Sequence, residues 1–512
     1  MRGLESAIKD ASTAKVSAYE RYRKRVWDEN RRRLRRSAGT PELLTPKRPS
    51  LWDLDPALDP FHVRARASPI SHAIESHMRS GSYTPLRPAG FRLRKHDGTH
   101  RLVTAFAIAD EVVSSRLYRS LLRKNRARLS ARSYAYRDDL SLYDALAHMQ
   151  SEWRDERRLF VAQYDFSDFF GSISHEHIRS TISSLGLTMT SLERRLLEAF
   201  LKAPKPYTSL IEKARPSASL RRGVHQGTSI SLLLANIAAT PLDRSLERLG
   251  ISFVRYADDL IMWSRDYSAL CRGVEELHLL SERSGCEINQ TKSMGVRLLV
   301  SEQIKEAEMA HTASVDYLSH SVGLRSVRMM KDAETQIRRR VTAYLFNHLL
   351  REPTSGTQNM TRLATGVDRD YVAYIWQLRK YLYGNLSEEQ VRRLLRGPLP
   401  PVALTGAVAR FPLVNDTEQL RELDAWIATQ TWLALRRRAD LLGPACFAPP
   451  KPWDRTRDEL VWFRWTSMTT GQPVDSRLPS VQRMAEVVRR AVQTHGTRVV
   501  GRGTDLYGFR GI

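Results

Sequence analysis

The stretch ISFVRYADDLIMWS, residues 251–264, decides the fold. Two apolar runs of β type flank Ala257, Asp258 and Asp259, which is the pattern of a hairpin with a tight turn. Two adjacent carboxylates repel each other, so something must neutralise them. A divalent cation at the hairpin tip does this, whereas the plain alternative is an ordinary Asp-containing turn. The apolar flanks and Tyr256 favour the cation.

A second carboxylate follows a strand-like run in RLFVAQYDFSDFFGSISHEHI, residues 158–178. Asp165 stands where the apolar run from Phe160 ends, so its side chain is expected at the edge of the sheet. An isolated Asp there would more often cap a helix or a turn. Beside Asp258 it completes a site for two Mg²⁺ ions about 3.5–4 Å apart, with Mn²⁺ as the alternative ion. Such a pair activates a primer 3′-hydroxyl and stabilises leaving pyrophosphate.

Seven stretches in this order resemble the motifs of reverse transcriptases. Motif B departs from the family pattern at His225 and Leu232, where proline is usual. A single YADD is weak evidence, but seven ordered motifs are strong evidence. The motifs are HRLVTAFAIADEVVSSRL (motif 1, 100–117), SYAYRDDLSLYDAL (motif 2, 133–146), YDFSDFFGSI (A, 164–173), RRGVHQGTSISLLLANI (B, 221–237), YADD (C, 256–259), CEINQTKS (D, 286–293) and VDYLSH (E, 315–320).

The resemblance implies a role for individual residues. Asp165 and Asp258 are then the metal ligands, with Asp259 as a supporting carboxylate. Phe170 stands where the family has its steric gate against a 2′-hydroxyl, and the alternative is that it belongs to the core. The implied nucleotide contacts are Arg101, Arg137, Phe166, Phe170, Gln226, Gly227 and Lys292. Surface salt bridges are the alternative for the two arginines, a tight turn for Gln226 and Gly227, and a solvated loop position for Lys292.

The expected fold is α+β: a right-hand polymerase whose fingers and palm carry an antiparallel sheet, followed by an α-helical thumb and C-terminal region. Residues 1–60 form a basic N-terminal extension, and residues 61–155 form fingers with motifs 1 and 2. Residues 156–330 form the palm with motifs A to E. Basic amphipathic helices follow in residues 331–512.

Charge indicates a polyanionic partner. Lys and Arg number 81 against 56 Asp and Glu, a formal charge of +25. The run ERYRKRVWDENRRRLRR, residues 20–36, interleaves aromatic residues with basic ones. It predicts phosphate contacts, although a solvated helix face is the alternative. The predicted nucleic-acid contacts are Arg31, Arg32, Arg33, Arg35 and Arg36, with Tyr317 of motif E.

Several classes of protein are excluded. Three scattered cysteines form neither a disulfide framework nor a zinc motif, which fits a reducing cytoplasm. The longest apolar stretch, residues 230–242, is too short to span a bilayer. The first residues do not read as a secretory signal. The expected partners are structured RNA as a non-coding template, DNA product and dNTPs, with no membrane; the oligomeric state is left open.

The predicted function is RNA-directed DNA synthesis, that is, nucleotidyl transfer. Residues 80–106 and the helical extension resemble bacterial defence-associated reverse transcriptases, which implies a role in antiviral defence. The alternatives are a group II intron-type maturase, a non-catalytic RNA-binding maturase, and an RNA-dependent RNA polymerase. The intact set of Asp165, Asp258 and Asp259 argues against the non-catalytic alternative.

Overall fold

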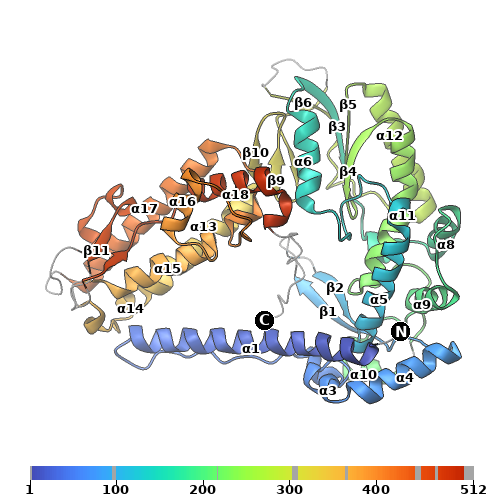
Figure 1. The fold of residues 1–512 in the computed structure, drawn as a ribbon, viewed down its shortest axis with the longest axis horizontal. Helices are drawn as coiled ribbons and strands as arrows, with labels where there is room; N and C mark the ends of the chain where they lie inside the picture. Colours follow the sequence, from blue (N-terminus) through green and yellow to red (C-terminus); the bar gives the residue numbers. More distant parts are fainter. Residues whose placement is uncertain are drawn as a thin grey trace.

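The chain is described by a computed structural model at residues 3–94, 98, 100–215, 217–301, 309–363, 367–443, 451–466 and 471–500. Figure 1 shows a sheet with its helices on one side, a helical lobe on the other, and one long helix running between them. This mixed architecture of fingers, palm and helical region confirms the predicted α+β class. In the described part of the chain, no helix combines the length and the apolar character that crossing a membrane requires.

The palm sheet holds five strands in the order β4-β5-β3-β6-β7. All neighbours are antiparallel except β6 and β7, which run parallel. The strands are β3 (Arg158–Tyr164), β4 (Ser252–Tyr256), β5 (Asp259–Ser264), β6 (Gly295–Val300) and β7 (His311–Thr312).

Helices cover both faces of this sheet, which explains why β3, β4 and β5 are apolar along their whole length. Val161 and Ile261 pack on the face covered by α6 (Leu142–Trp153). Their chain neighbours Ala162 and Leu260 pack on the other face, in the cluster with α11 (Ser229–Arg248) and α12 (Tyr267–Ser284). The two-residue period of the strands therefore fixes their register.

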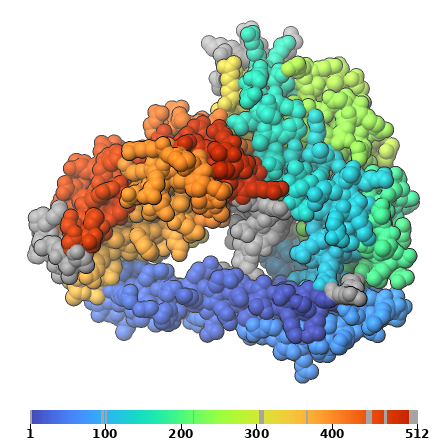
Figure 2. All heavy atoms as spheres, in the orientation of Figure 1, coloured from blue at the N-terminus to red at the C-terminus, as the bar shows by residue number. Residues whose placement is uncertain are grey.

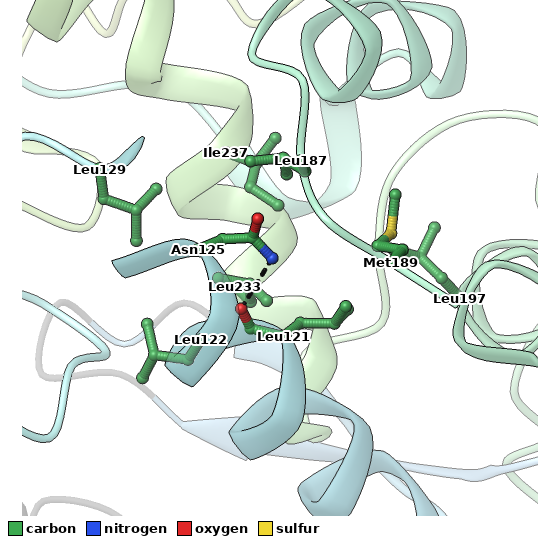
Figure 3. Close-up of a pocket in the computed structure, with 9 residues that line it drawn as sticks. All are labelled: Leu121, Leu122, Asn125, Leu129, Leu187, Met189, Leu197, Leu233 and Ile237. Carbon is green, nitrogen blue, oxygen red and sulfur yellow. Dashed lines mark hydrogen bonds between the residues drawn. The ribbon is translucent and has the colours of Figure 1, made fainter. Parts of the chain in front are cut away.

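The fingers combine a two-stranded hairpin with short helices. The hairpin pairs β1 (Ala89–Arg94) with β2 (His100–Ala105). Figure 3 shows how α5 (Ile108–Asn125) meets α11 through leucines and Ile237, with the amide of Asn125 donating to the Leu121 carbonyl at 2.9 Å. The other helices here are α2 (Leu51–Leu54), α3 (Pro60–Ala65), α4 (Ala67–Ser80), α7 (Phe169–Ser172), α8 (His175–Ser184), α9 (Ser191–Leu201) and α10 (Leu210–Ala214).

After the palm, a small three-stranded sheet leads into the helical lobe. Arg438 stabilises this lobe from inside, because its guanidinium pairs with Asp368 at 3.0 Å and Asp370 at 3.1 Å, all fully buried. The elements are β8 (Val315–Tyr317), β9 (His320–Val322), β10 (Val327–Met329), α13 (Lys331–Leu345), α14 (Arg351–Thr354), α15 (Arg369–Tyr383), α16 (Glu388–Arg396), α17 (Thr417–Leu442), β11 (Arg464–Thr466), β12 (Pro473–Asp475) and α18 (Val481–His495).

The long helix α1 (Leu4–Arg36) connects the two sides of the molecule. Its first half buries Leu4, Ile8 and Val16 against the fingers, whereas its last turn reaches the helical lobe near α14. Figure 2 shows an opening through the molecule between α1, in blue, and the orange residues of the lobe.

Candidate active site

The sheet register brings the carboxylates of motifs A and C together. Tyr164, the last residue of β3, lies opposite Leu260, so Asp165 follows at the level of Asp259. On the other side of β5, Tyr256 pairs with Asp259, which leaves Ala257 and Asp258 as a two-residue turn. Ala257 has a φ of 63°, in the region required by tight hairpin turns. Asp165, Asp258 and Asp259 therefore meet at one end of the palm sheet.

Three acids lie close together at this end of the palm sheet, and their charges affect one another. Burial, and after it the charges of Asp165 and Asp258, raise the pKa of Asp259 to about 7. The ammonium of Lys292, in motif D, lies 3.7 Å from the Asp165 carboxylate and is the nearest ion-pair partner that this acid has among the described residues. Three acids meet at this edge and the lysine beside Asp165 is exposed, which favours a cation at the site.

The donor set fits Mg²⁺. Hard divalent cations take oxygen ligands, and Mg²⁺ commonly binds one or two carboxylates while waters and substrate phosphates fill its other positions. No group of three or more His, Cys, Asp or Glu side chains in the described ranges has a metal-binding arrangement of its own. Asp165 and Asp258 would therefore hold a cation that is completed by nucleotide and water oxygens.

A buried arginine, which sequence reasoning missed, fixes the catalytic turn. Arg255 is 1% exposed, and its guanidinium forms two hydrogen bonds to Asp243 of α11, at 2.7 and 2.6 Å. It also donates to the Ala257 carbonyl at 2.9 Å, Asn236 at 3.1 Å and Ser133 at 2.9 Å. The turn is thus tied to α11 and to motif 2. The sequence does carry a signal for this pair, since Arg255 and Asp243 each stand in or beside an apolar run. A charge that is buried requires a partner of opposite charge.

The motif B turn is fixed to the fingers. The backbone N–H of Thr104, on β2, donates to the Gln226 carbonyl at 2.9 Å, and the Thr104 hydroxyl donates to the same oxygen at 2.5 Å. Gly227 has a φ of 148°, and a Cβ added there would lie 1.9 Å from the Thr104 carbonyl oxygen. Only glycine lets the two backbones approach this closely.

Residues 93–322 match the family model described as reverse transcriptase (RNA-dependent DNA polymerase). This segment, somewhat under half of the chain, is similar to reverse transcriptase domains. It contains the three acids, the motif B turn and the Arg255 network. None of the curated proteins matches the chain in sequence.

Among solved structures, the chain is similar to telomerases. Apo telomerase from Candida tropicalis, truncated from its C-terminal domain, is 12% identical over 50% of this chain and 59% of its own, with a TM-score of 0.38. Candida albicans telomerase with a TWJ fragment of telomeric RNA is 12% identical over 72% and 65%, with a TM-score of 0.37. The chain thus spans less than two thirds of these telomerase chains.

The predicted nucleotide contacts of the reverse transcriptase domain lie in different environments. Phe170 is 9% exposed, with its ring centroid 6.3 Å from that of Tyr136 and, on its other side, 6.3 Å from that of Phe169. Its carbonyl accepts from the Val224 N–H at 2.6 Å, so it borders the motif B loop. Phe166 is 5% exposed and packs on Phe169, which makes it a core residue here rather than a nucleotide contact.

Of the two arginines predicted to bind phosphate, Arg137 is described with its partners and the Arg101 side chain is not. Arg137 is 6% exposed, and its guanidinium forms two hydrogen bonds to Asp139 and donates a third, at 2.7 Å, to the Ser130 carbonyl. Arg137 thus holds the motif 2 loop in this structure, and its contact with the triphosphate stays a prediction. Arg101 lies on β2, but its side chain falls outside the described part of the structure.

Tyr317 and Arg36 were predicted to contact nucleic acid, and their burial contradicts this. Tyr317 is 1% exposed, and its hydroxyl donates to the Asp259 carbonyl at 3.2 Å, so it supports the catalytic hairpin from below. Arg36 is 2% exposed and pairs with Glu29 and Glu352. Arg33 is largely covered too, because it donates to the Glu42 carbonyl at 2.8 Å. Arg31, Arg32 and Arg35 remain exposed.

Substituting Gly227 by alanine is expected to lower kcat/KM for nucleotide addition about tenfold to a hundredfold. The added Cβ must displace the Thr104 carbonyl, and overpacking of this kind costs about 1–3 kcal/mol. Gly250→Ala is the matched control, because Gly250 has a φ of 68° but no atom within 4 Å of its Cβ position. Equal activity of the two variants in primer extension would show that the contact between turn and strand is unimportant.

Proposed function

We propose that this chain is an RNA-directed DNA polymerase. The observation that carries the proposal is the register that places Asp165 beside Asp259 and the Asp258 turn, inside a domain that matches the reverse transcriptase family. The substrates are dNTPs and a primer 3′-hydroxyl paired with an RNA template.

The chemistry follows from the positions of these groups. Two bound Mg²⁺ ions would lower the pKa of the primer hydroxyl and neutralise charge on the transferring phosphate. Asp165 and Asp258 would hold the cations, and Asp259, whose pKa is raised to about 7, would support them from β5. Lys292, an exposed residue 3.7 Å from Asp165, would give a proton to the leaving pyrophosphate. Arg255 acts as a positioning residue that holds the turn.

Sugar selection is assigned to Phe170. Substituting Phe170 by valine is expected to raise the rNTP-to-dNTP ratio of kcat/KM by about tenfold or more, because the smaller side chain leaves room for a 2′-hydroxyl. Phe169→Leu is the control, since Phe169 is 2% exposed and packs on Phe166. If Phe170→Val leaves the ratio unchanged, Phe170 is a core residue and another group selects the sugar.

We infer that the template is a structured non-coding RNA, held by Arg31, Arg32, Arg35 and the helices after residue 331. The net charge of +25 and the exposure of these three arginines support this. Service in bacterial antiviral defence is the cellular role that the sequence resemblance favours. Sequencing the nucleic acid that co-purifies with the protein tests both statements: a defined RNA with complementary DNA supports them, and bulk cellular RNA without DNA opposes them.

A further inference from the structure

Residues 20–50 form an arm that leaves the fingers and returns to them. The outward half is the second half of α1, and residues 38–50 run back beside it. The side-chain N–H of Asn30 donates to the Leu44 carbonyl, and the Leu44 N–H donates to the Asn30 side-chain oxygen, both at 2.8 Å. The Lys47 N–H donates to the Tyr22 hydroxyl at 3.4 Å. The arm is therefore a helix with a returning chain packed along it.

Both ends of the arm are anchored at the same place on the fingers. The ring of Tyr19 lies edge-on to Trp52 and Phe61, at centroid distances of 5.1 and 6.4 Å. Trp52 belongs to α2, which follows the returning chain. Because the two ends of the arm meet at one cluster of rings, opening its tip would leave its base on the fingers.

The tip of the arm is held by the helical lobe through contacts that we call the latch. The Ala38 N–H donates to the Thr357 carbonyl at 2.7 Å, and the Asn359 N–H donates to the Arg36 carbonyl at 2.8 Å. These bonds frame a short antiparallel pairing of Ser37 with Gln358.

An ion pair seals the latch. Arg36 lies 3.3 Å from Glu352, which is 4% exposed, and its guanidinium approaches Nδ1 of His348 at 3.4 Å. Burial, and then Arg36, lower the pKa of His348 to about 4, so this ring is neutral at neutral pH and can accept the bond. The other oxygen of Glu352 has no partner among the described residues, so its charge depends on Arg36.

With the latch closed, the arm and the helical lobe border the opening seen in Figure 2. Between its anchor and its latch the arm is strongly basic. Trp27 is 56% exposed there and carries the Arg31 guanidinium 4.6 Å above its ring. On the α1 half of the arm, residues 20–36, Glu20 is the exposed acid, and the returning chain adds exposed Glu42, Lys47 and Arg48. The exposed cationic residues of the α1 half are Arg21, Arg23, Lys24, Arg25, Arg31, Arg32 and Arg35.

We propose that the arm is a strap that closes around the bound nucleic acid and retains it topologically. The proposal rests on the proposed polymerase function, which supplies the nucleic acid in the opening. The free span of α1, residues 20–35, is about 24 Å long at 1.5 Å per residue, enough to face about seven phosphates of one strand. A closed strap keeps the enzyme on its template when salt weakens the phosphate contacts, and release requires the latch to open.

A disulfide across the latch tests this. Ala38 and Thr357 lie opposite each other in the latch pairing, where Cα atoms are about 5.5 Å apart, within disulfide range. The variant Ala38→Cys/Thr357→Cys is loaded, reduced, onto a primed circular RNA and onto a linear RNA of the same sequence. It is then oxidised and challenged with high salt and heparin. The half-life on the circle is expected to exceed that on the linear RNA at least tenfold, and reductant should abolish the difference.

Wild-type protein under the same oxidant is the control for its native cysteines. Equal loss from circular and linear RNA would overturn the proposal. So would efficient loading of pre-oxidised protein onto the circle, or a pair that stays reduced in a folded protein. Ser37→Cys/Gln358→Cys, the directly bridged pair of the latch, replaces the first pair if that variant does not fold. Because retention is measured by binding, it is independent of catalysis, whereas failure of the polymerase function appears as absent extension on linear template under reducing conditions.

Discussion

Replacing Asp258 by asparagine is expected to slow Mg²⁺-dependent primer extension by about a thousandfold or more, on the order of 4 kcal/mol in activation free energy. Asparagine keeps the shape of the side chain but removes one of the charges that hold the cations. The same substitution removes repulsion from Asp259, whose pKa the charge of Asp258 raises. Thermal stability without metal should therefore stay the same or rise.

The control for this experiment is Asp155→Asn, which removes a carboxylate that is 82% exposed and far from the catalytic turn in sequence. Extension of a primed template and thermal melting are measured for both variants and the parent. Full activity of a well-folded Asp258→Asn protein would contradict the assignment of the active site. A loss of stability equal to the loss of activity would give Asp258 a structural role.

Replacing Arg255 by methionine is expected to destabilise the folded protein by about 3–5 kcal/mol, because Asp243, which is fully buried, is left without its counter-ion. Activity should fall further than stability alone explains, since the Ala257 carbonyl also loses its donor. Denaturant unfolding and primer extension, measured below the unfolding transition, separate the two effects.

The double variant Arg255→Met/Asp243→Leu separates them more sharply. Removing both charges should recover most of the stability, because neither partner is then left unpaired. It should not recover activity, since the catalytic turn is still untethered. Arg265→Met is the control, as Arg265 pairs with Glu156 at the surface, where such pairs contribute little. Recovery of activity in the double variant would show that the network serves stability alone.

The positions of the three palm acids could be predicted from sequence because they follow from local rules. A strand exposes the residue after its last apolar position at the edge of the sheet, and a two-residue hairpin places its turn there too. Asp165 follows the first rule and Asp258 the second, and the register of β3 with β5 then brings them to the same edge. The switch to helices near residue 331 was also visible, because helical periodicity is a local signal.

The basic and aromatic residues could not be sorted in this way. Arg31 and Arg36 stand five residues apart on one helix, and the sequence gives no sign that one is exposed while the other is buried against Glu352. The distinction depends on a contact between segments more than 300 residues apart. Arg137 is similar: its pairing with Asp139 is local, but its burial depends on how motif 2 packs against the palm.

The central claim is that this chain copies RNA into DNA at the site formed by Asp165 and Asp258. The most direct test extends a primer annealed to an RNA of known sequence, with all four dNTPs, in Mg²⁺ and in chelator, and sequences the product. The account predicts DNA complementary to the template, formed only with the metal. A product made preferentially from rNTPs, or one formed equally well in chelator, would contradict it.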